Sequence, residues 1–142
     1  TLPDDGAAHA SWPPGTWDVT VILQRPGETV ERSTNGLPLL LAPRVDFGAS
    51  SAVRNAGTGA VTVTLVFTPQ ARPGQKPSPN AGGHEALPAS LTAQTGTLDF
   101  VFPELGAGPQ WLRLRVDGAD SLLLDRSSTP QFNSTQKMAI PA

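Results

Sequence analysis

The chain has 142 residues, which is enough for one β domain with an extension or for two small domains. Its formal charge of −2 and its pI near 5.5 argue against nucleic acid as a partner, because binding to nucleic acid needs a basic face. The absence of cysteine excludes a disulfide framework and a thiolate nucleophile or ligand. No apolar run approaches the roughly 20 residues of a membrane span.

The first part of the chain predicts a loop followed by a few strands. Residues 1–15 are rich in proline, glycine and aspartate, which favours a loop. Alternating apolar residues then predict a strand from Thr16 to Arg25, and residues 30–34 are expected to pair weakly. Residues 37–42 form a short apolar strand that contains Pro38, so we place it at an edge or start it at Leu39.

After Pro43 the strand pattern restarts. A stretch rich in glycine, serine and alanine follows the first of these strands as far as Gly59. Residues 69–85 contain almost nothing apolar and predict a long exposed loop or a strand with an eroded pattern, and residues 87–92 are compatible with a further strand. No window has helical spacing without a breaker. The expected strands are 44–47, 61–67, 97–102, 112–117 and 137–140.

The clearest structural prediction is a β-hairpin near residues 106–124. From Leu112 to Asp117 apolar and charged residues alternate strictly, so Leu114 is expected to face a core. Asp117-Gly118 accepts the positive φ angles of a tight hairpin turn, and we expect the chain to return through residues 121–124.

The expected fold class is all-β. Short strands with turns between them predict an antiparallel, immunoglobulin-like β-sandwich over residues 43–142. Residues 1–42 supply too few strands for a domain of their own, so we interpret them as the C-terminal strands of a second, truncated β-sandwich. A weak internal repeat between residues 13–23 and 108–116 favours two tandem sandwiches. Alternatively, the early strands add to the sheet of residues 43–142.

The residues that most often carry chemistry do not form a recognisable site in the sequence. His9 and His84 lie in predicted loops without the cluster of ligands that zinc requires, and no G-x-S-x-G motif is present. Asp117, Asp120 and Asp125 are close in sequence, as calcium ligands can be, but they lack the EF-hand pattern, and the first is explained by its turn.

Two further patterns are explained by structure. Asp99 and Glu104 flank the end of a strand, as paired carboxylates of a glycosidase can, but the alternation makes Asp99 an outward-facing charge. The glycines at 57–59 are not followed by a helix, as a phosphate-binding loop would be. We therefore predict no catalytic, cofactor-binding or metal-binding residues, no cofactor and no enzymatic activity.

The three tryptophans offer the best case for a binding module. Trp17 and Trp111 each begin an alternating strand and are expected to close off a core. Trp12 lies beside Pro13-Pro14 and is the one expected to be partly exposed, where it could stack on a sugar ring. The packing interpretation is favoured over glycan binding.

Several segments, taken in order, carry a family resemblance. V-T-V-T-L-V-F-T-P-Q-A-R-P-G-Q at 61–75, the run at 95–123 with its R-L-R-V-D-G-A-D-S core, and K-M-A-I-P at 137–141 resemble the C-terminal immunoglobulin-like domain of cap (tube-terminating) proteins of bacterial contractile injection systems. P-P-G-T-W-D-V-T-V at 13–21 looks like the last strands of the IPT/TIG-type sandwich that precedes that domain.

The resemblance implies a structural role in a phage-tail-like particle assembled in the bacterial cytoplasm. Its partners would be other subunits of the particle or further copies of the same protein, and oligomerisation would belong to an N-terminal platform domain that this chain does not contain. The resemblance implies no catalytic residue, and it leads us to expect an apolar strand where residues 76–84 are loop-like. The alternative hypothesis is an immunoglobulin-like module of a secreted enzyme or adhesin that binds carbohydrate or protein.

Overall fold

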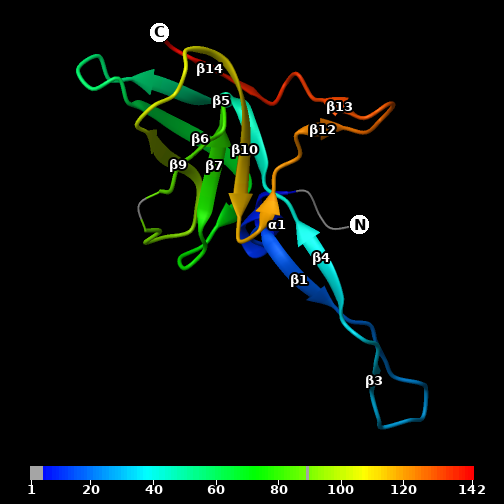
Figure 1. The fold of residues 1–142 in the computed structure, drawn as a ribbon. Helices are drawn as coiled ribbons and strands as arrows, with labels where there is room; N and C mark the ends of the chain where they lie inside the picture. The colour runs from blue at the N-terminus through cyan, green and yellow to red at the C-terminus, as the bar shows by residue number, and fades with distance from the viewer. Residues whose placement is uncertain (1–4, 89) are drawn as a thin grey trace.

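A computed structural model describes residues 5–88 and 90–142 (Figure 1). Nearly all regular structure in these residues is antiparallel β-strand, which confirms the predicted all-β fold class. The elements are α1 (Gly6–Ser11), β1 (Gly15–Val19), β2 (Ile22–Leu23), β3 (Arg32–Ser33), β4 (Leu37–Leu41), β5 (Arg44–Arg54), β6 (Val61–Ala71), β7 (Pro77–Ala81), β8 (His84–Glu85), β9 (Thr95–Phe102), β10 (Gly108–Val116), β11 (Ala119–Asp120), β12 (Leu124–Asp125), β13 (Gln131–Phe132) and β14 (Lys137–Ile140).

Two antiparallel sheets form the body of the molecule. The first has the order β5-β6-β9, and in the second β8 pairs with β7, β7 with β10, and β10 with both β11 and β14. The amide of Leu112 donates to the carbonyl of Gln136 and the amide of Leu114 to the hydroxyl of Ser121. Because amides two residues apart point to the same side of a strand, β14 and the β11 return share one edge of β10.

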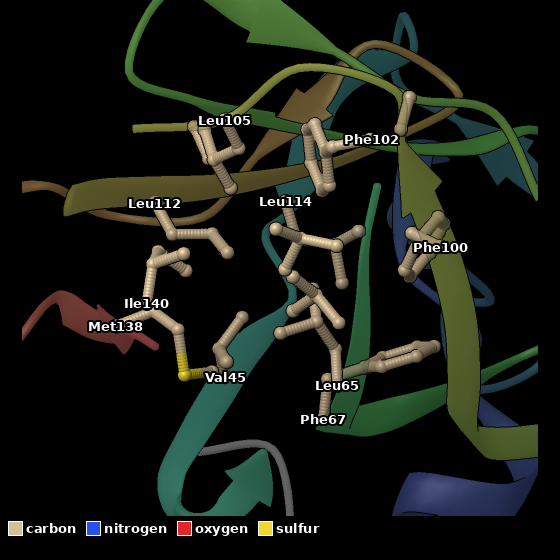
Figure 2. Close-up of a cluster of buried hydrophobic side chains, with 14 of the residues drawn as sticks. Val45, Leu65, Phe67, Phe100, Phe102, Leu105, Leu112, Leu114, Met138 and Ile140 are labelled. Carbon is tan, nitrogen blue, oxygen red and sulfur yellow. The ribbon is translucent and has the colours of Figure 1, made fainter. Parts of the chain in front are cut away.

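The core lies between these two sheets (Figure 2). Val61, Val63, Leu65 and Phe67 of β6 are fully buried, as the alternation predicts. Large apolar side chains of this kind stabilise a fold by about 1.5–3 kcal/mol each when they leave water. The remaining members of the core cluster come from β5, β6, β7, β9, β10, β14 and the segments between strands: Val45, Ala71, Ala81, Ala86, Phe100, Phe102, Leu105, Leu112, Leu114, Val116, Met138 and Ile140.

The predicted hairpin is present, with a shorter return strand than expected. Asp117 and Gly118 have φ angles of 46° and 84°, so both take the left-handed conformation that a two-residue turn requires. The return is β11, whose two residues pair with Arg115 and Val116. The prediction of a return through residues 121–124 was wrong, because the chain leaves the sheet after Ser121 and residue 124 pairs with β13 instead.

Strand β5 is longer than the predicted strand at 44–47. It continues to Arg54 through the stretch rich in small residues and pairs with β6 on both sides of a register shift between Asp46 and Ser51. A carboxylate oxygen of Asp46 accepts the amides of Gly48 and Ala49, which stabilises the bulge. The bulge breaks the period of two, and the sequence pattern therefore hid the second half of the strand.

A buried strand, β7, lies within the segment 69–85 that predicted an exposed loop or an eroded strand. Four of its five residues are buried, and it pairs with β10. The carbonyl of Pro79 accepts the amide of Ala86 on the β8 side. Since the nitrogen and carbonyl of one residue point to the same side, the ring nitrogens of Pro77 and Pro79 are turned away from β10, and no hydrogen bond to β10 is lost. The loop interpretation was wrong for residues 77–81.

The N-terminal segment contains a short helix where a loop was predicted. Asp5 caps α1, because its carboxylate accepts the amide of Ala8 at 2.8 Å. The loop prediction was therefore wrong for residues 6–11, while residues 1–4 lie outside the described part of the chain. Residues 87–92 form no strand in their described part, and Ala89 lies outside it.

The segment that leads from α1 to β1 is held against the sandwich. The guanidinium of Arg72 donates to the carbonyls of Ala10 and Ser11 at 3.1 and 2.7 Å. The amide of the Gln75 side chain donates to the carbonyl of Pro14 at 2.7 Å. The chain therefore enters β1 from the surface of the sandwich.

Strands β1 to β4 form a two-stranded arm (residues 15–41) that projects from the sandwich (Figure 1). β1 pairs with β4 over five residue pairs and β2 with β3 over two. The predicted strand from Thr16 to Arg25 is interrupted at residues 20–21. Within the described residues the arm strands pair only with each other, so the alternative in which they extend a sheet of residues 43–142 is not observed.

Candidate interaction surfaces

The two histidines lie on different elements of the fold. His9 is half-buried on α1, and His84 is exposed on β8. Across the described residues, no group of three or more histidine, aspartate or glutamate side chains is arranged to hold a metal ion. Within the same residues, no helix is long and apolar enough to cross a membrane.

Asp117 connects the β10–β11 turn to the chain before β7. Its carboxylate accepts the backbone amide of Lys76 at 2.9 Å and the side-chain amide of Gln75 at 3.0 Å. The same glutamine bonds to Pro14, so a single side chain links the turn to the N-terminal segment. Asp117 therefore has a structural role, because it joins the β10–β11 turn to the chain before β7.

Asp120 and Asp125 have different partners. Asp120 receives two hydrogen bonds from the guanidinium of Arg115, at 2.7 and 3.1 Å, and lies 3.3 Å from a nitrogen of Arg113. The hydrogen bond with Arg115 lowers the pKa of Asp120 and raises the pKa of Arg115. The amide of Ser127 donates to Asp125 and lowers its pKa. Each of the three aspartates considered as calcium ligands therefore accepts hydrogen bonds from different partners.

The other candidate motifs also have structural partners. Asp99 points outward from β9 and accepts the hydroxyl proton of Thr64 across the sheet at 2.6 Å. Glu104 is exposed in the segment after β9. Residues 57–59 form the β5–β6 hairpin loop, in which the side chain of Asn55 accepts two backbone amides. A strand, β6, follows this loop, whereas a helix follows a phosphate-binding loop.

The outer face of the second sheet carries a row of polar side chains. The hydroxyl of Ser78 donates to Glu85 at 2.7 Å, beside the cluster of Arg113, Arg115 and Asp120. A cleft of about 30 Å³, enough for about one water molecule, lies among Ser78, Glu85, Arg113 and Arg115. The charged groups of this face pair with one another.

A larger cleft, of about 760 Å³, separates the start of β5 from the β12–β13 excursion. Its lining mixes polar and apolar groups and includes Arg44, Leu122, Asp125 and Arg126. The carboxylate of Asp125 already accepts a hydrogen bond from the amide of Ser127, and Leu122 is exposed. The cleft has the size of a ligand site, but it lacks a convergent set of buried polar groups in the described residues.

The three tryptophans make local aromatic contacts. Trp12 is 42% exposed and packs on Trp17 with ring centroids 5.1 Å apart. The indole of Trp17 donates to the carbonyl of Pro13. Trp111 is half-buried against Phe132, and the ammonium of Lys137 lies 4.3 Å above its ring. Trp17 and Trp111 therefore pack against neighbouring side chains, and Trp12 is the more exposed ring.

The arm presents the largest concentration of exposed aliphatic side chains in the described structure. Eight large apolar residues between positions 19 and 40 are exposed: Val19, Val21, Ile22, Leu23, Val30, Leu37, Leu39 and Leu40. Isolated exposed apolar residues are ordinary on protein surfaces, whereas a contiguous group marks a contact surface.

The register of the arm separates two faces. Trp17 lies opposite Leu39 and Val19 opposite Leu37, so these side chains share one face, with Leu41 at its base. We call these five residues the apolar face of the arm. Thr16, Asp18, Pro38 and Leu40 occupy the other face. Sequence alternation predicted the strands of this region but not that their apolar side chains would stay in solvent. The signal was the small number of strands, because a two-stranded sheet cannot cover its own apolar face.

Two arginines that the sequence analysis did not single out hold separate parts of the molecule together. Arg54 donates to the carbonyls of Gly59, Leu105 and Pro141 at 2.8, 2.8 and 2.9 Å. Arg72 fixes the N-terminal segment, as described above. No local motif identifies either residue, since their acceptors are backbone carbonyls as far as 87 positions away.

Comparison with known proteins gives a family but no described activity. A family model described as "Domain of unknown function (DUF8756)" matches residues 43–139. No curated protein and no solved structure matches the chain. Since the match spans more than half of the 142 residues, the chain belongs to the DUF8756 family.

Proposed function

We propose that this chain is a non-enzymatic structural domain that acts through protein–protein contact. The observation that carries the proposal is the arm, which exposes eight aliphatic side chains, three of them (Val19, Leu37 and Leu39) on one face. The aspartates with the strongest claim to chemistry have structural partners: Asp117 holds a turn, Asp120 an ion pair and Asp99 a cross-strand hydroxyl.

The proposed fold is an immunoglobulin-like sandwich over residues 43–142. In such sandwiches, strands A, B and E are neighbours in one sheet, and strands C′, C, F and G in the other. The order β5-β6-β9, and the order β8-β7-β10 with β11 and β14 beside β10, support this proposal. The chain departs from antibody domains in having no cysteine pair, and Pro79 occupies the strand that carries their buried tryptophan.

The proposed domain boundary is Pro43, with residues 1–42 forming a separate β unit. The match of the family model to residues 43–139 supports this division. A chain of residues 43–142 is then expected to unfold cooperatively at the same temperature as the full chain. A much lower melting temperature would place residues 1–42 in the same folding unit.

For the biological setting we propose the role that the family resemblance implies, an accessory region of the cap protein of a contractile injection system. The test is immunogold labelling of contractile particles purified from the source bacterium, with antibodies raised against residues 43–142. Label at the particle end distal to the baseplate is the expected result. Particles that carry no label and no peptide of this chain by mass spectrometry would refute this setting without affecting the fold proposal.

A glycan-binding module is the second candidate, because Trp12 is 42% exposed. Although Trp12 packs on Trp17, part of its indole ring stays in solvent, where a sugar could stack on it. Titration with a panel of oligosaccharides, followed by tryptophan fluorescence in the wild type and in Trp12→Ala, tests this candidate. A saturable change that disappears in Trp12→Ala would favour it over the structural role, and an unchanged spectrum with all sugars would eliminate it.

A further inference from the structure

Two arginines of the described residues make neither a hydrogen bond nor an ion pair there, and both line the same cleft. Arg44 begins β5 and Arg126 follows β12, and both border the cleft of about 760 Å³ beside the β12–β13 excursion. The other arginines each pair with a carboxylate or donate to a backbone carbonyl: Arg25, Arg32, Arg54, Arg72, Arg113 and Arg115. The guanidinium groups without a partner are therefore concentrated at one place on the surface.

The remaining polar groups of the cleft leave further donors free. The side-chain oxygen of Asn133 accepts the amide and the hydroxyl of Thr135, at 3.0 and 2.8 Å. Its side-chain nitrogen makes no hydrogen bond within the described residues and is available as a donor. The carboxylate of Asp125 accepts the amide of Ser127 and forms no ion pair with either arginine in this part of the chain. The cleft therefore suits a ligand that supplies hydrogen-bond acceptors.

The charges of the cleft favour a carboxylate over a phosphate. The guanidinium groups of Arg44 and Arg126 against the carboxylate of Asp125 leave one net positive charge, in a chain whose formal charge is −2. A guanidinium binds a carboxylate through parallel hydrogen bonds of matching geometry. A phosphate group carries about two negative charges at neutral pH, so one of them would stay uncompensated beside Asp125.

Apolar groups form the rest of the lining. Leu122 and Leu124 are exposed and border the cleft together with Ala42 and Pro43. An aliphatic group that covers the two leucines removes apolar surface from water, which favours binding. The ligand that fits the cleft therefore combines a carboxylate with an aliphatic portion.

The exposure of the cleft favours a segment of chain over a small molecule. Arg44, Arg126, Leu122 and Leu124 are all exposed, whereas a small-molecule site encloses most of its ligand. The β12–β13 excursion supplies one wall and lies outside the body of the sandwich (Figure 1). Arginine clusters of this kind are a recurring means of recognising acidic peptide motifs.

We propose that this cleft binds an acidic segment of a partner protein, in which an aspartate or glutamate lies next to an aliphatic residue. The acidic side chain pairs with Arg44 and Arg126, and the aliphatic side chain covers Leu122 and Leu124. This inference rests on the proposed protein-contact role and deepens it, because it names the chemistry of a partner at a surface other than the apolar face of the arm.

The experiment begins with a selection from a library of random heptapeptides displayed on phage, with the full 142-residue chain as the target. The proposal predicts enriched peptides that carry aspartate or glutamate beside leucine, isoleucine or valine. One enriched peptide is then synthesised and titrated by fluorescence anisotropy against the wild type, Arg44→Gln and Arg126→Gln. The matched control is Arg25→Gln, which removes one positive charge from an exposed side chain at the tip of the arm. Equal melting temperatures verify that these exposed substitutions leave the fold intact.

Arg44→Gln and Arg126→Gln are each expected to weaken peptide binding at least about tenfold, and Arg25→Gln less than about twofold. The same peptide with glutamine in place of its acidic residue should lose affinity to a similar extent. Isovalerate, a small aliphatic carboxylate, should displace the peptide at lower concentration than inorganic phosphate does.

Four results would overturn the proposal. They are a selection that enriches no acidic peptide, an equal loss of affinity in Arg25→Gln, displacement by phosphate at lower concentration than by isovalerate, and unchanged binding to both cleft variants. Unchanged binding would place the contact elsewhere on the chain and leave the proposed protein-contact role intact. The failure of the cleft is thereby distinguished from the failure of that role.

Discussion

The sandwich and the arm contain the same kind of strand but bury it differently. In β6 and β10, apolar side chains alternate with polar ones and reach zero exposure because a second sheet covers them. In β1 a comparable alternation leaves Val19 in solvent, and its partner β4, which is apolar at almost every position, leaves Leu37 and Leu39 in solvent on the same face. Alternation therefore determines that a strand has an apolar face. A second layer determines whether that face becomes a core or a contact surface.

The largest expected effect comes from one substitution made in both regions. Leu114→Ala in β10 removes a fully buried side chain and is expected to cost about 2–5 kcal/mol of unfolding free energy. The same change at the exposed Leu37 is expected to cost less than about 0.5 kcal/mol.

Urea unfolding of both variants and the wild type measures the difference. The variant Arg113→Ala checks the phase of β10. Because Arg113 lies on the outer face beside Leu114, its substitution should cost much less unfolding free energy than Leu114→Ala. Equal losses for Leu114→Ala and Leu37→Ala would mean that the arm shares the core.

The second prediction compares the two arginines. Arg54→Ala removes three hydrogen bonds that join β5 to backbone carbonyls of the sandwich, with an expected loss of about 2 kcal/mol. Arg72→Ala removes bonds to the N-terminal segment alone, so the global loss should stay below about 1 kcal/mol. Chemical unfolding measures both values. A larger loss for Arg72→Ala would make α1 and its connection part of the cooperative unit.

These cases show what could be predicted from the sequence. Strands with unbroken alternation, such as β6, were predicted together with their buried face, and Asp117-Gly118 predicted its turn. The second half of β5 was missed because a bulge breaks the period. For β7 the sequence left a loop and an eroded strand both open, because Pro77 and Pro79 suppress the usual composition of a strand, although neither removes a hydrogen bond to β10.

The candidate surface was harder to predict, since exposure depends on what covers a side chain. Residues 1–42 supply strands that need further strands, which is the physical reason that the apolar face exists. The sequence does not place Leu37 and Leu39 on one face and Leu40 on the other, because that requires the register of β1 and β4. The carbonyl contacts of Arg54 depend equally on tertiary structure.

The smallest expected effect concerns the ion pair on the second sheet. The pKa of Asp120 is lowered in the folded state by its hydrogen bond with Arg115. A lowered pKa means that the pair stabilises the fold above the ordinary pKa of aspartate and that this contribution is lost as the pH falls through the lower value. Because the pair is partly solvent-screened, Asp120→Asn should lower Tm by at most about 3 °C at neutral pH.

Thermal scans at several pH values check this prediction. The difference in Tm between the wild type and Asp120→Asn should shrink as the solution is acidified below the ordinary pKa of aspartate. A difference that grows on acidification would contradict the assigned direction of the pKa shift.

The most direct test of the contrast between sandwich and arm is amide hydrogen exchange of the full chain. Amides of β6, β9 and β10 should exchange only through global unfolding, and those of β1 and β4 much faster. Arm amides as protected as those of the core strands would contradict this account.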